Sequence, residues 1–361
     1  MSRVLVAMSG GIDSTISAVL LHQQGHEVVG LTMKTWDYAS AGGSKKETGC
    51  CSLDSINDAR AVAVEVGFPH YILDMRDEFG ESVIDDFASE YMIGRTPNPC
   101  VMCNTHIKWD ALLRRADMMN CEFIATGHYA KIQNDGNRYW VSAGDDPKKD
   151  QSYVLWGLDQ SVLKRTMFPV GGMKKTEVRH LAKELGFLDL STKKESFEIC
   201  FIPDNDYRGF LKRRIPDIDK TIGNFVNIHG DIMGRHTGYP FFTVGQRHGL
   251  GITSTEPLYV IDIDPTTCNV MLGKSSDLRV SAIHVDGVKF QKSEIFDKCS
   301  VKVRYKTEPI SCSAKVTGEF SMILTPDDPI SGVAPGQSAV LYDGQDVLGG
   351  GIISKTEKLF S

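Results

Sequence analysis

The chain has 361 residues, of which 41% are hydrophobic and 24% charged, and its formal net charge is −6. This length suits two or three domains, and the composition is typical of a soluble globular protein. The acidic balance argues against a protein that coats nucleic acid non-specifically. No segment approaches the roughly 20 apolar residues of a membrane span, and residues 2–8 are too short for a secretory signal. We therefore expect a cytoplasmic protein that makes no membrane contact.

The first 130 residues alternate between strand and helix patterns. Residues 3–8 are apolar and lead into two glycines, which predicts a buried strand of a parallel sheet. Apolar residues recur at helical spacing over 15–24, Gly25 is the predicted C-cap, and a second buried strand covers 27–33. The same alternation continues in helix 54–66, strand 70–73, helix around 79–91, helix 109–118 and strand 123–126.

This alternation predicts an α/β fold with a doubly wound parallel sheet. Ligands of such sheets bind outside the carboxyl ends of the strands, where the loop at Ser9 and the segment 126–128 both lie. Past residue 205 the pattern changes to Gly-, Thr- and His-rich sequence, and from about residue 278 short β-branched runs alternate with turns. We predict a catalytic domain over 1–205, a small central domain over 206–277 and an antiparallel, barrel-like β-domain over 278–361. The segment 37–49 is the predicted mobile loop.

The loop Ser9-Gly10-Gly11-Ile12-Asp13-Ser14 joins the first strand to the first helix. Adjacent glycines let backbone N–H groups turn toward an anion, and the helix N-terminus adds partial positive charge. Asp13 fits such a site if it orients a metal, and it is consistent with Mg²⁺ on a pyrophosphate leaving group. The Lys-Ser/Thr ending of a Walker loop and the G-x-G-x-x-G of a dinucleotide fold are absent from this loop. A plain capped turn is the alternative, but the full pattern matches the pyrophosphate loop of N-type ATP pyrophosphatases.

Two of the nine cysteines are candidate catalytic groups. Cys103 follows Pro97 and Pro99, which impose an extended approach to the next helix, and a thiol just before a helix N-terminus has a lowered pKa. Cys200 lies between apolar neighbours and, taken alone, reads as a buried core cysteine. Four others read as structural: Cys121, Cys268, Cys299 and Cys312.

The spacing Cys100-x-x-Cys103, together with Cys50-Cys51, is also compatible with a metal site or a redox-active cysteine pair. Adjacent cysteines are poor zinc ligands, and no second spaced pair exists, so we assign no metal site. Two basic clusters are most simply solvated faces: Lys298, Lys302, Arg304 and Lys306, and Arg208, Lys212, Arg213 and Arg214.

Taken in order along the chain, the motifs resemble those of the bacterial and organellar tRNA-specific 2-thiouridylases, and the resemblance covers essentially the whole chain. The motifs are Ala7–Ser14, Cys50-Cys51-Ser52, Thr96–Asn104, Thr126–Tyr129, Lys149–Tyr153, Phe168–Gly171, Cys200–Ile202 and Thr243–Gly251. The resemblance implies an adenine nucleotide alpha hydrolase-like catalytic domain. It also implies that ATP, with Mg²⁺, is bound by Ala7, Met8, Ser9, Gly10, Gly11, Ile12, Asp13, Ser14, Met33 and Gly127.

The resemblance further implies that the enzyme adenylates O2 of the wobble uridine in tRNA and replaces it with sulfur. Cys200 would carry a persulfide received from a sulfur-relay protein or a cysteine desulfurase. Cys103 would release that sulfur, which leaves a Cys103–Cys200 disulfide. The implied contacts with tRNA or the target base are Pro97, Asn98, Pro99, His128, Lys149, Asp150, Gln151, Arg304, Tyr305 and Gln337.

One position departs from the family pattern. Many members have Asp where this chain has Cys100, so the group that transfers protons near the uridine stays open. The competing interpretations are an ATP-pyrophosphatase that acts on a small acceptor, a non-catalytic nucleotide sensor on the same sheet, and a thiol redox protein. The redox reading would leave the phosphate loop unexplained.

Overall fold

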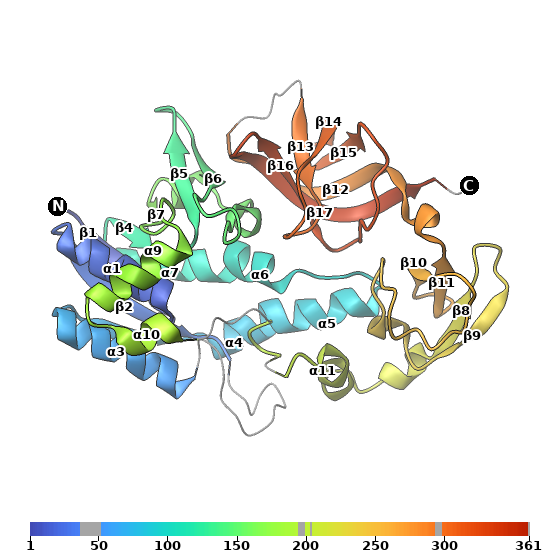
Figure 1. The fold of residues 1–361 in the computed structure, drawn as a ribbon, viewed down its shortest axis with the longest axis horizontal. Coiled ribbons are helices and arrows are strands. Elements are labelled where there is room, and N and C mark those ends of the chain that lie inside the picture. The colour runs from blue at the N-terminus through green and yellow to red at the C-terminus, as the bar shows by residue number, and fades with distance from the viewer. Residues whose placement is uncertain (37–51, 194–198, 203, 293–297, 360–361) are drawn as a thin grey trace. The chain divides into compact units, whose positions relative to one another are not determined.

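The computed structural model describes residues 1–36, 52–193, 199–202, 204–292 and 298–359 (Figure 1). The predicted loop 37–49 and the Cys50-Cys51 pair lie outside the described residues. The chain divides into two compact units. The first comprises Met1–Val83, Cys100–Asp206 and Gln345–Val347, and the second comprises Ile84–Pro99, Tyr207–Gly344 and Leu348–Ser361. None of the described helices is long and apolar enough to cross a membrane.

A five-stranded parallel sheet in the order β3-β2-β1-β4-β7 forms the centre of the first unit. Its strands are β1 (Arg3–Ala7), β2 (Glu27–Lys34), β3 (His70–Asp74), β4 (Phe123–Ala125) and β7 (Thr166–Met167). The strand β1 pairs in parallel with β2 on one side and with β4 on the other. The predicted doubly wound parallel sheet is confirmed, although the pattern did not predict the short β7.

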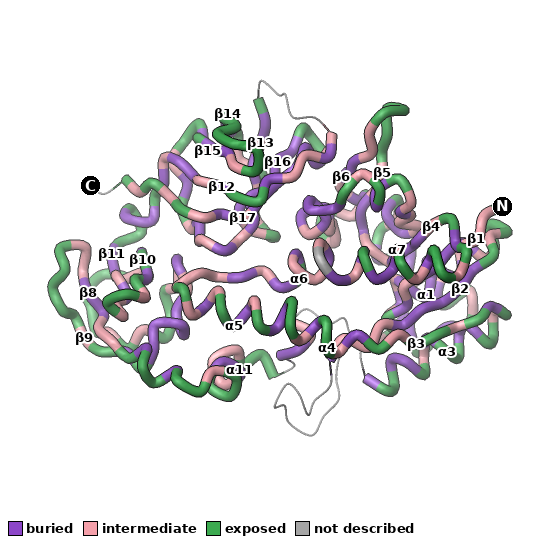
Figure 2. The backbone as a smooth tube through the Cα atoms, turned by 180° about the vertical axis from the view of Figure 1, so that it is seen from behind, coloured by how far each residue is buried: buried purple, intermediate pink, exposed green. Residues whose placement is uncertain are grey.

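Most residues of helix α1 (Ile12–Gln23) are buried, as the purple of its tube in Figure 2 indicates. Ala18 and Leu21 pack with β1 and with α3 (Leu53–Val66). Ile16 packs instead in a cluster with α9 (Lys175–Glu184) and α10 (Leu188–Thr192). Burial on both sides fixes the helix that follows the phosphate loop.

The chain becomes helical at Ile12, three residues before the predicted start, because extended Gly11 (φ −93°, ψ 158°) is already the N-cap. Gly25 (φ +84°) follows the C-cap Gln24, in the conformation that ends helices. Asp13 and Ser14 therefore lie in the first turn of α1.

Two helical stretches contain π-helical turns, which a periodicity of 3.6 residues does not predict. The helix expected around 79–91 consists of α4 (Arg76–Phe79), a π turn over Gly80–Ile84 and α5 (Asp85–Met92). Likewise α6 (Pro99–Met102) continues through a π turn over Cys103–Lys108 into α7 (Trp109–Met118).

The first unit also has a hairpin of β5 (Ala130–Asn134) and β6 (Tyr139–Ala143), which we did not predict. Its turn is held by Asp135, whose Oδ1 accepts from the N–H groups of Asn137 (2.9 Å) and Arg138 (2.8 Å). Ser142 of β6 pairs with Asp346 of the segment 345–347. A 3₁₀ turn over Ser152–Leu155 and α8 (Gln160–Leu163) complete this unit.

The second unit contains a four-stranded sheet in the order β10-β11-β8-β9 and helix α11 (Tyr207–Arg214). The strands are β8 (Gly223–Val226), β9 (Ile232–His236), β10 (Tyr259–Asp264) and β11 (Asn269–Gly273), with 3₁₀ turns over Ile218–Thr221, Tyr239–Phe241 and Ser275–Leu278. Aromatic contacts join α5 to α11: Tyr91 stacks on Tyr207 at 5.5 Å, and Phe87 meets Phe210 edge-on at 6.0 Å.

Six further strands close into a barrel in the order β12-β15-β14-β13-β16-β17, because β12 also pairs with β17. They are β12 (Val280–Phe290), β13 (Cys299–Lys302), β14 (Ile310–Gly318), β15 (Ser321–Pro326), β16 (Ser338–Asp343) and β17 (Asp346–Lys358). Closure removes the free edges that a sheet otherwise exposes. The predicted barrel-like domain is confirmed.

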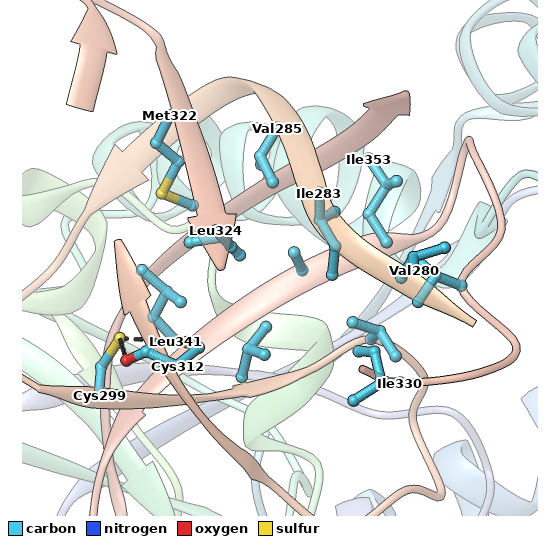
Figure 3. Packing of buried hydrophobic residues seen from close by; sticks show 14 of the residues in the cluster. Val280, Ile283, Val285, Cys299, Cys312, Met322, Leu324, Ile330, Leu341 and Ile353 are labelled. Carbon is cyan, nitrogen blue, oxygen red and sulfur yellow. Dashed lines mark hydrogen bonds between the residues drawn. The ribbon is translucent and has the colours of Figure 1, made fainter. Parts of the chain in front are cut away.

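Apolar side chains from the barrel strands meet in its interior (Figure 3). Ile283, Leu324 and Ile353 are each 0% exposed. Cys299 and Cys312 are opposite each other on β13 and β14, buried, with their Sγ atoms 3.4 Å apart. These two thiols fill space in the barrel core.

We predict that Leu324→Ala lowers the free energy of opening the barrel by about 2–5 kcal/mol, because it leaves a cavity in a closed core. Val316→Ala on β14, where the side chain is 50% exposed, is the matched control and should change it by less than about 0.5 kcal/mol. Hydrogen exchange at the amides of β12 and β15 measures this free energy. Equal effects of the two substitutions would contradict the assigned core.

Candidate active site

The candidate site lies at the carboxyl ends of β1 and β4, where the strand order of the parallel sheet reverses. The phosphate loop follows β1, and the Thr126-Gly127-His128 segment follows β4. A Cβ atom on Gly127 would stand 2.6 Å from the Ser14 nitrogen and 2.7 Å from the Asp13 carbonyl carbon. Only glycine fits there, so the structure brings the two predicted segments into direct contact.

The phosphate loop is shaped by its glycines and closed by serine hydroxyls. Gly10 has φ +68°, and a Cβ atom on it would stand 2.0 Å from the Ser55 carbonyl oxygen. The Ser14 hydroxyl donates to the Gly11 carbonyl (3.1 Å) and accepts from the Ser9 N–H (3.1 Å). The N-cap residue of α1 is Gly11, which has no side chain to cap the helix N-terminus. The first N–H groups of the helix and its dipole are thus available to an anionic ligand.

Asp13 is held by Lys175, which no sequence motif includes, and by Tyr129, which ends the Thr126–Tyr129 motif but had no predicted role. Lys175 Nζ lies 2.7 Å from each carboxylate oxygen, and the Tyr129 hydroxyl donates to Oδ1 at 2.7 Å. The Lys175 side chain is only 8% exposed. Nothing in the sequence distinguishes Lys175 from the chain's other lysines, because it is 162 residues away from its partner.

The expectation that Asp13 orients a metal ion stays a prediction. Both of its oxygens face the Lys175 ammonium group. Within the described ranges, no group of three or more His, Cys, Asp or Glu side chains is placed to hold a metal.

A second lysine reaches the loop from just beyond α10. Lys193 Nζ donates to the Gly10 carbonyl (3.0 Å), to the Ser55 hydroxyl (3.3 Å) and to Asp58 Oδ2 (2.7 Å). No motif or spacing in the sequence distinguishes this residue either. The loop is thereby connected to the first turns of α3.

His128 lies among aromatic rings at the end of β4. Its Nδ1 is 2.6 Å from the Thr126 hydroxyl, and its ring centroid is 6.2 Å from that of Trp109 and 5.9 Å from that of Phe168. Desolvation, with a smaller effect of the Lys108 charge, lowers the pKa of His128 to about 3. The imidazole is neutral at physiological pH and offers hydrogen bonds rather than charge.

Cys103 does not precede its helix as predicted, because helical structure begins at Pro99. The thiol is partly exposed and occupies the first position of the π turn. A helix dipole acts on groups in the first turn of the helix, so it gives no reason to expect a lowered pKa at Cys103.

Three buried polar atoms in or beside this turn have no hydrogen-bond partner among the described residues: Asn104 Oδ1, Thr105 Oγ1 and Trp109 Nε1. Such atoms are rare unless a ligand or water satisfies them.

Cys200 is partly exposed, unlike a core cysteine. Its neighbours Phe201 and Ile202 are 1% and 2% exposed, and Phe201 meets Phe79 edge-on with centroids 5.9 Å apart. The apolar neighbours that suggested burial are buried themselves, while Cys200 is only partly buried. Cys103 and Cys200 both belong to the first unit, as does the phosphate loop.

Some residues predicted to contact tRNA have structural partners in the first unit. Asp150 accepts from the Gly144 and Ser152 N–H groups, and Gln151 Oε1 accepts from the Tyr129 N–H (3.0 Å). Lys149 is partly exposed, and so is Met33 near the end of β2.

The other predicted tRNA contacts lie in the second unit. Gln337 Nε2 donates to the carbonyls of Thr96 (2.9 Å) and Pro97 (3.2 Å), so it holds the proline-rich segment that contains partly exposed Asn98 and buried Pro99. Arg304 Nη2 donates to the Val244 carbonyl (3.2 Å), and Tyr305 is 38% exposed.

Three family models match consecutive parts of the chain. The tRNA methyl transferase HUP domain matches residues 2–204, the tRNA methyl transferase PRC-barrel domain matches 208–274, and the aminomethyltransferase beta-barrel domain matches 275–353. A crystal structure of a 4-thiouridine synthetase–RNA complex with bound ATP resembles 60% of this chain and 51% of that one. Its identity is 18% and its TM-score 0.37, too low to carry an argument.

Curated relatives match over nearly their full length. The chain is 56% identical over 362 residues to the tRNA-specific 2-thiouridylase MnmA of Cytophaga hutchinsonii, covering 99% of this chain and 98% of that one. It is 56% identical to the protein of the same name from Amoebophilus asiaticus (99% and 96% covered) and 50% identical to that from Salinibacter ruber (97% and 94%). The chain therefore belongs to the family of tRNA-specific 2-thiouridylases.

Proposed function

We propose that this protein catalyses the ATP-dependent 2-thiolation of the wobble uridine in tRNA. One observation carries the proposal: a glycine loop with an uncapped helix N-terminus lies at the strand-order reversal, in the same unit as two partly exposed cysteines. The loop suits a polyphosphate, and the cysteines suit sulfur transfer. The names of the relatives support tRNA as the recipient of the sulfur.

In the first step the uridine O2 attacks the α-phosphorus of ATP, and the bond to the β-phosphate breaks. The N–H groups of α1 and the Ser9 and Ser14 hydroxyls bind the departing pyrophosphate. Met33 and Gly127 border the nucleotide. Mg²⁺, when bound, offsets phosphate charge, and phosphate oxygens rather than a protein cage would supply most of its ligands.

In the second step sulfur replaces the adenylated oxygen. Cys200 carries a persulfide donated by a sulfur-relay protein or a cysteine desulfurase. Its terminal sulfur attacks C2 of the uridine, and AMP leaves with O2. The Cys103 thiolate then attacks the Cys200 sulfur, which breaks the S–S bond to the nucleotide and leaves the 2-thiouridine and a Cys103–Cys200 disulfide. A thiol reductant restores both thiols before the next turnover.

The target base must leave the anticodon loop to reach these groups, which is inexpensive for a base in a loop. Neutral His128, beside Trp109 and Phe168, offers a hydrogen bond and aromatic surface to it. The unsatisfied polar atoms beside Cys103 support a polar ligand at this place. Pro97, Asn98, Pro99, Lys149, Asp150, Gln151, Arg304, Tyr305 and Gln337 remain the proposed tRNA contacts.

We predict that the protein, supplied with ATP, Mg²⁺, a persulfide donor and tRNA, releases pyrophosphate and thiolates the tRNA. Cys200→Ser and Cys103→Ser should abolish thiolation and retain pyrophosphate release, because adenylation needs neither thiol. Cys268→Ser, outside the first unit, is the control and should behave as the unmodified protein. A mercury gel of the tRNA and a pyrophosphate assay separate the two steps.

Retained thiolation in Cys200→Ser would remove the persulfide assignment. Pyrophosphate release that small metabolites stimulate without tRNA would instead favour a small-acceptor ligase. A protein that binds ATP and releases no pyrophosphate under any of these conditions would be the nucleotide sensor.

We further predict that neutral His128 makes the first unit sensitive to acid. The unfolded chain takes up this proton near pH 6.5 and the folded chain only near pH 3, so this stability is present above pH 6.5 and is lost as the pH falls. Between pH 6.5 and 5 the loss is up to about 2 kcal/mol. His128→Gln should remove that slope in urea denaturation followed by tryptophan fluorescence. Identical slopes in both proteins would show that His128 titrates normally.

A further inference from the structure

Two buried or half-buried lysines approach the phosphate loop from one short segment of the chain. Lys175 is the first residue of α9, and Lys193 follows the end of α10. One contacts the side chain of Asp13 and the other contacts the backbone of Gly10. From this we propose that Lys175 and Lys193 are positioning residues that fasten the Cys200-bearing part of the chain to the ATP site. The inference rests on the function proposed above.

The Lys175 contact fixes the first turn of α1. Its Nζ is bidentate on Asp13, and Tyr129 supplies a third hydrogen bond to the same carboxylate. Lys175 is itself fixed, because its N–H donates to Asp146 Oδ2 (2.9 Å) and α9 packs on α1 through apolar residues. Removing the lysine would leave a carboxylate without its cation beside the phosphates of ATP. That loss of charge balance weakens ATP binding.

The Lys193 contact is geometric rather than a source of stability. Its ion pair with Asp58 is about two-fifths exposed, and such pairs contribute little. The carbonyl of Gly10 accepts this bond in a loop whose Gly10 has left-handed backbone (φ +68°). Lys193 therefore contacts the loop at one of the glycines that shape it.

Two contacts flank Cys200 in the sequence. Lys193, seven residues before it, contacts the loop, and Phe201, directly after it, packs on Phe79, while residues 194–198 lie outside the described residues. A change in the loop on ATP binding would reach Lys193 without any further contact. The two lysines thus act on different steps, Lys175 on ATP binding and Lys193 on the placement of the Cys200 sulfur.

The Lys175 role is tested by a double-mutant cycle on pyrophosphate release. Lys175→Met should raise the KM for ATP by about tenfold or more, and it should have little further effect in an Asp13→Asn background, where both charges are gone. Lys183→Met, an exposed lysine on the same helix, is the control. An unchanged KM in Lys175→Met, or its full effect in the Asp13→Asn background, would overturn this role.

The Lys193 role is tested by the rate at which Cys200 is alkylated, measured by peptide mass spectrometry. The rate is compared with and without ATP, and tRNA is left out of both reactions. ATP should change this rate several-fold in the unmodified protein and in Lys193→Arg, and should not change it in Lys193→Met. Lys193→Met should also retain pyrophosphate release while thiolation falls by about a hundredfold, as for a misplaced reactant. An ATP effect that persists in Lys193→Met, or that is absent from the unmodified protein, would overturn the proposal. An ATP effect on Cys200 in a protein that never thiolates tRNA would overturn the proposed function and leave the coupling intact.

Discussion

The bidentate contact between Lys175 and Asp13 solves an electrostatic problem that the phosphate loop creates. A carboxylate in the first turn of a helix is stabilised by the helix dipole, but it would repel the polyphosphate that we propose binds at the same turn. Pairing the carboxylate with a buried lysine keeps the capping charge and cancels its repulsion. Walker loops carry their lysine within the loop sequence, whereas here α9 supplies it from outside.

Because the cation comes from α9, the loop depends on tertiary packing. Ile16 and Val19 of α1 meet Val178 and Ala182 of α9, and this apolar contact sets the distance across which Lys175 reaches Asp13. The loop sequence by itself specifies a turn and an uncapped helix. The pairing that would make the turn compatible with the proposed polyphosphate ligand exists only in the folded unit.

Much of this could be predicted from the sequence where the signal is local. Runs of apolar residues and their spacing predict the strand at Arg3–Ala7 and the helix at Trp109–Met118. The glycines at positions 10 and 11 predict the loop. What could not be predicted depends on partners far apart in the chain. Lys175 and Lys193 look like ordinary residues until the fold places them beside the loop, and Tyr129 is known only as the end of a motif. Cys200 looked buried because its neighbours are, and only the structure separates this partly exposed residue from the buried residues around it.

The π turn over Cys103–Lys108 places one extra residue in a stretch that otherwise looks like a plain helix. A π turn closes its hydrogen bonds over five residues, whereas an α-helical turn closes them over four. Deleting one residue between positions 103 and 108 would therefore let the stretch relax to regular α-helix, while the turns on either side kept nearly their mutual orientation. A deletion within α7 would have no extra residue to remove, and it would rotate the side chains on one side of the deletion by about 100° relative to those on the other. A loss of one residue is therefore expected to be tolerated better in this stretch than in the regular helix that follows it.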